Sequence, residues 1–481
     1  WVGGVAPSPG AELVFPVGAA RKINTNNFAA GTAFQRILLE DTGYTLRGNQ
    51  IKLLGNTALP VVGNIIMAMD VPGTNDISMP ILVDTNVAKE IRSLATLLNI
   101  NSGISLAQSG NLHFAFGVFS NRLGITGPGG VVVQGAATVT MAVDAPNTYS
   151  GITRNGGVLI MGATGQQAIP GNADTYSSLI FPDPGLYRWF SSEVIADTSL
   201  FRVYGTLEMN GFSETVREFR PLGDVNIQNG TLRVTDDVRP GNFSLDTNAV
   251  VNVHGTGGAI EFPAGTHSII QTSALSALSL NVPLSGPGNL LKIGSERLFL
   301  LRSNDFTGVF TINDGPVIIS NSWALGATSA GTVIGAGGTM VLGSVGVPFN
   351  LTNEPITALA GARISRQGPS SVRIPGPISL PSPGPVVTVT NPSVSVNIVF
   401  EGPLTGAGGL TINGNTFFTG TNQNTYTGAT VVERGRLTIL KSAGKAMGGN
   451  LIIGDDDPFD DEESVNFSGR SEEHTSELQS P

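Results

Sequence analysis

The stretch Asn424-Thr-Tyr-Thr-Gly-Ala-Thr-Val-Val-Glu-Arg-Gly-Arg-Leu-Thr-Ile439 alternates turn residues with short apolar runs. Asn tolerates the left-handed region of backbone space and can bond to its own backbone, while Gly takes positive φ at no steric cost. Leu437 and Ile439 flank Thr438, so the last strand has one apolar and one polar face. The stretch therefore predicts short, half-buried strands joined by tight turns.

The same composite pattern occurs three times, at residues 127–160, 286–319 and 406–439. In each copy an opening Gly precedes an Asn by 20, 18 and 18 residues, respectively, and a second Gly follows the Asn. A composite pattern at a nearly fixed spacing is the signature of a repeat architecture. The second copy departs from the others, because it has Asp305-Phe306 where they have Thr-Tyr, and Pro316 delays its last strand.

Runs with a period of two lie between the copies, as expected for strands with one buried face. The alternating apolar positions are Leu112, Phe114, Phe116 and Val118; Leu278, Leu280, Val282 and Leu284; and Val394, Val396, Ile398 and Phe400. We expect the inward side chains to include Leu112, Phe114, Leu278, Leu280, Val396, Ile398, Leu410, Ile412, Leu437 and Ile439.

The composition agrees with a strand-and-turn protein. Charged residues are only 13% of the chain, and 63 of its 481 residues are Gly. Long soluble helices usually carry more Glu, Lys and Arg on their wet face. A hydrophobic fraction of 40% is enough for a core. No cysteine is present, which excludes a disulfide framework and Cys-based metal sites.

The motif at 424–439 resembles the autotransporter-associated β-strand repeat, found in the passenger regions of bacterial autotransporters. The resemblance covers about residues 112–469 and is specific at the three copies. It implies an all-β, right-handed parallel β-helix (β-solenoid) of the pectin-lyase-like kind, built as one elongated repeat domain. At about 20–25 residues per turn, we expect roughly 20 turns.

Residues 1–111 have a generally similar pattern but no specific match to the repeat motif. They are predicted to be an N-terminal β-rich part of the same solenoid. One segment has a helical alternative, a short helix near residues 86–98. Asp84 or Thr85 would cap it, and Ile91 and Leu98 would share a face with Leu94 and Ala95. An ordinary strand is the other reading of this segment.

The net charge of −10 is concentrated near the end of the chain. Seven acidic residues lie within 455–463, and the remaining body before the tail is nearly neutral. The chain thus lacks the basic field that nucleic acid attracts, and we expect no nucleic-acid partner. The run 455–463 could attract calcium, but a solvated loop is the preferred interpretation.

Residues 470–480, Arg-Ser-Glu-Glu-His-Thr-Ser-Glu-Leu-Gln-Ser, resemble a translated sequencing adapter. We therefore expect the tail 470–481 to be artefactual and the natural sequence to be interrupted near Gly469. The chain starts at Trp1, so an export signal is expected upstream, and an outer-membrane translocator or sorting module is expected beyond the C-terminus. The sequence contains no run of 18 apolar residues, so we predict no transmembrane segment within it.

Few residues in the sequence are candidates for catalysis or metal binding. The three histidines before the tail, His113, His254 and His267, are scattered, and we interpret them as surface residues rather than metal ligands. No nucleophile, zinc or phosphate-loop motif occurs. The expectation is therefore no catalytic residue, no cofactor and no metal.

Parallel β-helices also host polysaccharide lyases and hydrolases, which gather carboxylates or basic residues on adjacent turns. Asp236 and Asp237 with Arg239, and Arg217 with Arg220, are the candidates for such a cluster; solvated turn charges are the simpler interpretation. A cluster across neighbouring turns would favour the enzyme.

The function expected from these observations is non-catalytic. The resemblance implies a secreted or cell-surface passenger on the exterior of a Gram-negative-type outer membrane, acting in adhesion to host or environmental glycans or proteins. The alternatives are a β-helical polysaccharide lyase or hydrolase, and an inert spacer that carries a module outside this sequence.

Overall fold

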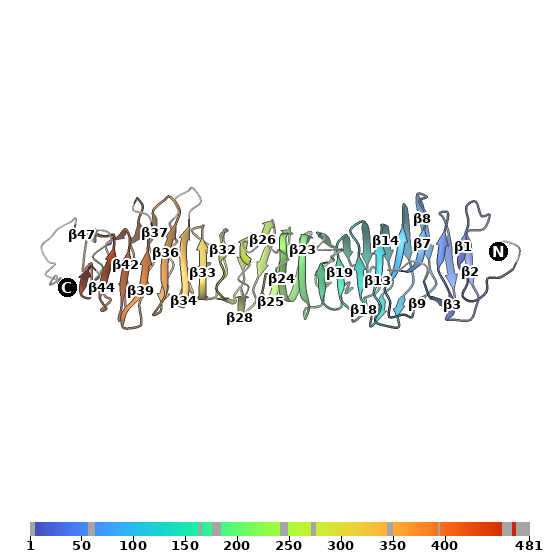
Figure 1. The fold of residues 1–481 in the computed structure, drawn as a ribbon, viewed down its shortest axis with the longest axis horizontal. Helices are drawn as coiled ribbons and strands as arrows, with labels where there is room; N and C mark the ends of the chain where they lie inside the picture. Colours follow the sequence, from blue (N-terminus) through green and yellow to red (C-terminus); the bar gives the residue numbers. More distant parts are fainter. Residues whose placement is uncertain are drawn as a thin grey trace. The chain divides into compact units, whose positions relative to one another are not determined.

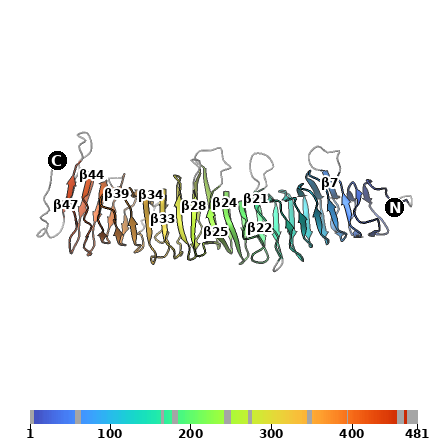
Figure 2. The same ribbon diagram turned by 90° about the horizontal axis from the view of Figure 1, so that it is seen from below.

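The computed structural model describes residues 5–55, 63–162, 166–175, 184–240, 249–270, 276–343, 350–392, 395–454 and 464–467. All regular secondary structure in these ranges is β-strand, and no helix occurs in them. The strands form a right-handed parallel β-solenoid of about 17 turns, which confirms the predicted fold class (Figures 1 and 2). The finer pectin-lyase-like assignment stays a prediction.

The chain divides into two units, residues 1–234 with 256–258 and residues 235–255 with 259–481. Each unit is a stack of parallel strands in its own right (Figure 1). The single elongated domain expected from the sequence stays a prediction.

In the first unit, two strand columns run through successive turns and merge into two long strands, and a third column lies beside them. The first column is β1 (Leu13–Phe15), β4 (Ile37–Leu39), β7 (Gly63–Ala68), β10 (Lys89–Ser93), β13 (Leu112–Ala115), β16 (Val131–Val133), β19 (Thr153–Asn155) and β21 (Ala173–Thr175). The second is β2 (Ile23–Asn26), β5 (Thr45–Gly48), β8 (Gly73–Ile77), β11 (Thr96–Ile100), β14 (Gly117–Asn121), β17 (Ala137–Met141), β20 (Val158–Met161) and β22 (Gly185–Trp189). The third is β3 (Thr32–Phe34), β6 (Ile51–Leu53), β9 (Ile81–Val83), β12 (Ile104–Leu106), β15 (Ile125–Gly127) and β18 (Thr148–Tyr149). The merged strands are β23 (Leu200–Glu208) and β24 (Ser213–Gln228).

The strands β25 (Thr231–Val238) and β26 (Ala249–Thr256) come next in the sequence, and in the second unit they pair in parallel with later strands. Its first turns contain β27 (Ala259–Glu261), β28 (Thr266–Ile270), β29 (Ser276–Asn281), β30 (Leu284–Ser285), β31 (Asn289–Ile293), β32 (Leu298–Leu300), β33 (Phe310–Ile319) and β34 (Thr332–Gly343). Its later turns contain β35 (Ile356–Ala358), β36 (Arg363–Gln367), β37 (Val372–Ile374), β38 (Ile378–Ser379), β39 (Gly384–Thr390), β40 (Ile398–Phe400), β41 (Leu404–Thr405), β42 (Gly408–Asn413), β43 (Thr416–Phe418), β44 (Thr430–Arg434), β45 (Arg436–Ile439), β46 (Leu451–Ile453) and β47 (Ser464–Phe467).

The core lies inside each stack, where one face of every strand is buried. All ten side chains predicted to point inward are buried. They are Leu112, Phe114, Leu278, Leu280, Val396, Ile398, Leu410, Ile412, Leu437 and Ile439. Val394 lies outside the described residues. Aromatic rings add edge contacts between turns, as in Tyr187 and Phe201, whose ring centroids are 5.2 Å apart.

The prediction that Phe116 and Val118 share the buried face of Leu112 is wrong. Both are exposed, and Phe119 is buried instead. The reason is a corner at Phe116 and Gly117, whose φ values of 55° and 98° end β13 and reverse the alternation. Phe116 packs under the guanidinium of Arg92, which lies 4.8 Å from its ring centroid.

The helical alternative near residues 86–98 is also wrong, because the segment forms β10 and the start of β11. Ile91 and Leu98 point inward as a helix would also have required, but Leu94 is exposed at the corner between the strands. β10 pairs with β7 on one side and β13 on the other. A helix here would leave the facing N–H and C=O groups of both neighbours without partners, which outweighs local helix propensity.

The conserved geometry of the three repeat copies explains why each requires Asn. Asn424 accepts a hydrogen bond from the Leu404 amide of the preceding turn (3.0 Å) and donates to the Ala446 carbonyl of the next (2.6 Å). Asn147 and Asn304 make the same pair of bonds in their own copies. Each side chain is buried, and it provides hydrogen-bond partners for two backbone groups that no neighbouring strand reaches.

The expected delay of the last strand of the second copy at Pro316 is wrong, because β33 runs through Pro316, which pairs in register with Thr339.

The replacement of Thr-Tyr in the second copy is compensated within that copy. In the first and third copies a buried Tyr hydroxyl bonds a Thr hydroxyl four residues later, Tyr149 to Thr153 and Tyr426 to Thr430, both at 2.5 Å. In the second copy both positions are Phe, and Phe306 packs edge-on against Phe310. A hydrogen-bonded pair is thus replaced by an apolar pair, and no buried hydroxyl is left unpaired.

The second Gly of each copy allows adjacent turns to come close together. A Cβ on Gly428 would lie 2.4 Å from backbone atoms of Gly408 and Gly409. Gly151 and Gly308 face the preceding turn in the same way. Only Gly accommodates this approach.

Candidate functional site: a charged ladder on the outer face of β19 to β24

Charged side chains line up on the outward face of four neighbouring strands in the first unit. Arg154 of β19 pairs in register with Asp174 of β21, and Arg202 of β23 pairs with Arg220 of β24. Asp174 also forms an ion pair with Arg202, which joins the two halves of the column. In-register residues on neighbouring parallel strands lie about 4.8 Å apart. The strand pairing therefore produces a ladder of charges along the stack.

Each carboxylate in this ladder is held by arginine. Arg202 Nη1 lies 3.1 Å from Asp174 Oδ2, and Arg220 Nη2 lies 2.6 Å from Glu218 Oε2. Arg217 contacts the other oxygen of Glu218. The carboxylate side chains are the more buried partners, 15% exposed for Asp174 and 9% for Glu218, while the arginines are 33–43% exposed. The arginines therefore present the positive end of each pair to solvent.

Burial acts to raise the pKa of Glu218, but hydrogen bonds and charges from Arg220 and Arg217 outweigh it, and the pKa is lowered. A carboxyl group with a lowered pKa stays ionised near neutral pH. It therefore acts as an anchor for arginines rather than as a proton donor.

An aromatic side chain, Tyr204, shares strand β23 with Arg202. Tyr204 follows Arg202 by two residues, so both point to the outer face of β23, and the pairing of β23 with β24 is interrupted at this position. A Cβ on Gly223 would lie 2.9 Å from the Tyr204 ring. Gly223 thus makes room for the Tyr204 ring where the pairing of β23 with β24 is interrupted.

Two further buried acids belong to the core of the turns. Glu214 accepts hydrogen bonds from Trp189 Nε1 (2.7 Å) and from the amides of Val194 (3.0 Å) and Ile195 (3.1 Å). Burial raises its pKa to about 8 despite these donors. Glu354 accepts from the Thr332 hydroxyl, and burial raises its pKa to about 7.

The Glu214 carboxyl predicts a pH dependence of stability. Because its pKa is higher in the folded state than the ordinary 4.5, its stabilising contribution is complete below about pH 4.5 and is lost as pH rises through about 8. We expect the free energy of unfolding to fall across this window in urea titrations, and the Glu214→Gln variant to show a shallower fall. Glu208→Gln, on the outer face, is the matched control and should keep the parent slope. Equal slopes for the parent and Glu214→Gln would contradict the prediction.

Of the charged residues singled out in the sequence, Arg217 and Arg220 belong to the first unit, and Asp236, Asp237 and Arg239 belong to the second. Arg217 and Arg220 are brought together by Glu218 and belong to the ladder. Asp237 is buried and bonds Arg239, with Arg239 Nη2 2.7 Å from Asp237 Oδ2, while Asp236 is exposed.

The three histidines are spread apart, and they differ in exposure. His113 is partly buried beside Gln134 (3.2 Å), and burial together with the charge of Arg154 lowers its pKa to about 4. His254 is partly exposed. The expectation that His267 lies on the surface is wrong, because it is buried with Nε2 2.7 Å from the Pro263 carbonyl. In the described part of the chain, no group of three His, Asp or Glu side chains could hold a metal.

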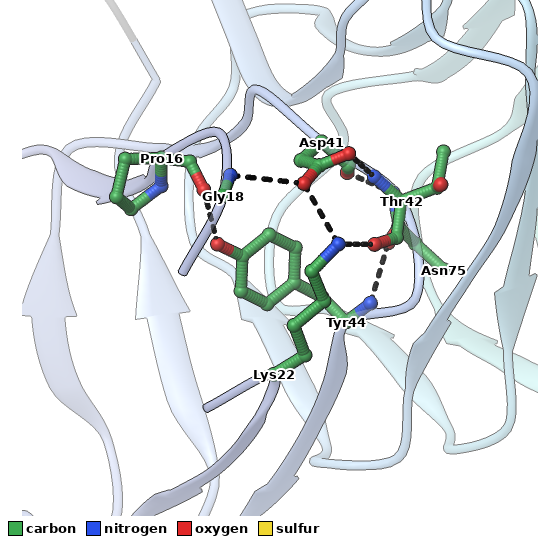
Figure 3. A network of polar contacts seen from close by, with 7 residues as sticks. All are labelled: Pro16, Gly18, Lys22, Asp41, Thr42, Tyr44 and Asn75. Atoms are coloured by element: carbon green, nitrogen blue, oxygen red, sulfur yellow. Dashed lines mark hydrogen bonds and ion pairs between the residues drawn. The ribbon is translucent and has the colours of Figure 1, made fainter. Parts of the chain in front are cut away.

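A second polar cluster lies in the first turns (Figure 3). Lys22 Nζ contacts Asp41 Oδ2 (2.7 Å) and the Thr42 carbonyl (2.6 Å), and the Tyr44 hydroxyl donates to the Pro16 carbonyl. Asn75 Oδ1 accepts from the Tyr44 amide. The bond from Lys22 is the largest of the contributions that lower the pKa of Asp41 to about 2. The cluster ties together neighbouring turns, so we assign it a structural role.

A cavity of about 600 Å³ lies beside this cluster. Its walls include Leu13 and Phe15 of β1 and residues 23–26 of β2. In the described structure β1 and β2 each pair with a strand on one side only. The cavity is therefore the open side of the first described turn. The acidic run 455–463 and the tail 470–481 lie outside the described residues.

Sequence reasoning missed Asp174, Arg202, Tyr204 and Glu218. An outward position in a strand marks Arg202 and Tyr204, since each follows a buried apolar residue. Their alignment with residues of other turns, however, depends on turn lengths. Eighteen residues separate Phe201 from its partner Phe219, whereas 29 separate Ile37 from Ile66. No single spacing therefore brings the ladder together in the sequence.

The fold defines the chain as a parallel β-solenoid with an arginine-rich outer face on part of its first unit. Comparison of the sequence and structure with protein-family models, curated proteins and solved structures gave no match. Within the described ranges, no helix has the length and apolar character needed to cross a membrane.

Proposed function

We propose that the chain is a non-catalytic, surface-exposed β-helical scaffold that binds glycans or proteins through its outward strand faces. The resemblance of its repeat motif to autotransporter passengers supports a secreted location on the exterior of a Gram-negative-type bacterium and a role in adhesion. The proposal is carried by one observation: the carboxylates of the only charged ladder identified among the described residues are engaged by arginines, and the exposed groups are hydrogen-bond donors.

Other outward positions support the same interpretation. Asp76, Asn99, Ser120 and Thr140 lie in register on four successive strands of the second column. Asn99 Nδ2 donates to Asp76 Oδ1 at 3.0 Å. Such polar columns offer many weak contacts in a row, and repeated weak contacts gain strength when several molecules bind together.

The experiment compares the free chain with the same chain displayed on a tetrameric carrier, on immobilised neutral, carboxylated and sulfated polysaccharides. We expect weak binding by the free chain and an increase of about 10²-fold or more on the tetramer. The adhesion proposal would be overturned if the tetramer bound none of these polysaccharides and bound neither bacterial nor epithelial cell surfaces.

A second candidate function is favoured by the ladder itself, since charges on adjacent turns are what a β-helical polysaccharide lyase or hydrolase requires. The same polysaccharides are therefore incubated with the chain and assayed for new reducing or unsaturated ends. We expect none. Turnover that disappears in Glu218→Gln, Asp236→Asn or Asp237→Asn would replace the scaffold proposal by the enzyme.

A further inference from the structure

Resting on the proposed function, we propose that the ladder formed by Arg154, Arg202 and Arg220, together with Tyr204, is a binding site for a linear glycan that carries carboxylate or sulfate groups. The site lies on the outer face of β19, β21, β23 and β24.

The charge of the site favours an anion. The column Arg154, Asp174, Arg202 and Arg220 contains three arginines and one carboxylate, and Glu218 pairs with Arg220, so these five residues carry a net charge of +1. Among the described residues, Arg154 has no ion-pair partner within 4 Å. This excess stands out because the body of the chain is nearly neutral.

The arginines retain hydrogen-bond donors for a ligand. Within the described structure, Arg202 donates through Nη1 to Asp174, and Arg220 donates through Nε and Nη2 to Glu218. Arg202 thus keeps Nε–H and Nη2–H, and Arg220 keeps Nη1–H. The ion pairs fix the two guanidinium planes in place, so less side-chain entropy is lost when an anion binds. Planar guanidinium groups match the two oxygens of a carboxylate or sulfate.

The direction of the ladder favours a linear ligand. Arg202 and Arg220 are in-register neighbours, about 4.8 Å apart along the stack. Each of the two arginines therefore has a neighbour of the same charge on the next strand, in addition to its own carboxylate partner. A chain with anionic groups repeated along its length would contact both positions at once, whereas a single small anion would contact fewer of them.

Tyr204 favours a sugar over other polyanions. Its ring lies over Gly223, where a larger residue would collide with it. The C–H groups on one face of a pyranose ring pack on such an aromatic ring, while the hydroxyl and acidic groups at the sugar edge reach neighbouring donors. Single-stranded nucleic acid also stacks on aromatic rings, so it is included in the test as a competing ligand.

The experiment measures binding by the full chain to oligogalacturonate, dextran sulfate, neutral dextran and an oligothymidylate, at about 0.05 M and about 0.5 M salt. We expect binding to one or both acidic glycans, weakened at high salt, and little binding to neutral dextran. Selective binding of oligogalacturonate or of dextran sulfate identifies carboxylate or sulfate as the preferred group.

Four variants locate the site. Arg202→Gln combined with Arg220→Gln should weaken acidic-glycan binding at least about tenfold. Tyr204→Leu should weaken it several-fold while Tyr204→Phe, which keeps the ring, should not. Arg122→Gln is the matched control, because it removes a charge from an exposed ion pair with Asp144 on the same unit. Its affinity should equal that of the parent. The double variant should melt at a lower temperature, because Asp174 loses Arg202 and Glu218 loses Arg220, so all affinities are compared at a temperature at which circular dichroism shows every variant to be folded.

The possible outcomes distinguish an error in the proposed binding site from an error in the proposed function. If the parent binds acidic glycans but the ladder variants bind equally well, or if Arg122→Gln weakens binding as much as the double variant, the site is wrong and the scaffold function stands. Tighter binding of oligothymidylate than of either acidic glycan at the same salt would overturn the ligand class. If the parent binds no glycan even on the tetrameric carrier, the site proposal fails, and the broader function is then decided by the cell-surface assay described above.

Discussion

Replacing Phe201 by Ala is expected to lower the free energy of unfolding of the first unit by about 3–5 kcal/mol. Phe201 is fully buried, and its ring contacts Tyr187 at 5.2 Å and Phe219 at 6.4 Å between centroids. Removal of the ring takes away apolar contacts with both neighbouring turns. Because the strands above and below are fixed by their own hydrogen bonds, the cavity can close only in part.

Urea denaturation followed by circular dichroism measures this effect. Phe190→Ala is the matched control, since Phe190 belongs to the same unit but is 55% exposed. We expect it to change the free energy of unfolding by no more than about 0.5 kcal/mol. A loss for Phe201→Ala no greater than that for Phe190→Ala would show that the inward stack contributes less than its burial implies.

The second large effect is expected at the repeat Asn. Asn424→Ala removes both bonds that connect the Leu404 amide and the Ala446 carbonyl to the side chain between them. Both backbone groups would then be unpaired at a site where the side chain itself is buried. At about 1–3 kcal/mol for each unpaired buried group, we expect a loss of roughly 2–4 kcal/mol.

Asn422→Ala is the control for this prediction, because Asn422 is exposed two residues earlier in the same turn. It should leave the unfolding midpoint unchanged. Asn304→Ala and Asn147→Ala should reproduce the loss, since those residues make the same bonds. If Asn424→Ala and Asn422→Ala unfold at the same urea concentration, water or a backbone shift replaces the bridge and its proposed role is wrong.

The site was less predictable than the core. Arg217 and Arg220 were recognised in the sequence as a charged pair, but Glu218 between them was not recognised as their shared partner. Glu218 and Arg220 are two residues apart and share a face of the strand, but Arg217 is adjacent to Glu218, so the alternation of side chains does not predict that both arginines reach it. The burial of His267 was missed for a related reason: the room for its ring is provided by Gly288, where a Cβ would lie 2.6 Å from the imidazole.

The alternation of buried and exposed side chains followed the sequence pattern within regular strands and failed at the corners between strands. Leu112 and Phe114 are buried as their alternation predicts, whereas Phe116 and Val118 are not, because a residue with positive φ at the corner reverses the alternation. In the segment 86–98, strand pairing on both sides decided against the helix that the local pattern allowed. Hydrogen bonds to two neighbouring turns are a property of the stack, and no window of the sequence contains them.

The sequence by itself determined the all-β class and the inward face of most strands, because Gly, Asn and a period of two are local signals that each turn repeats. The parallel solenoid was implied by the resemblance of the repeat motif. The tertiary structure alone decided which residues of different turns become neighbours. Partner residues lie 18 residues apart in one pair of turns and 29 in another, since the loops between strands vary in length. Arg202 therefore meets Arg220, and Asp174 meets Arg202, only once the turns have stacked and the strand hydrogen bonds have set their register.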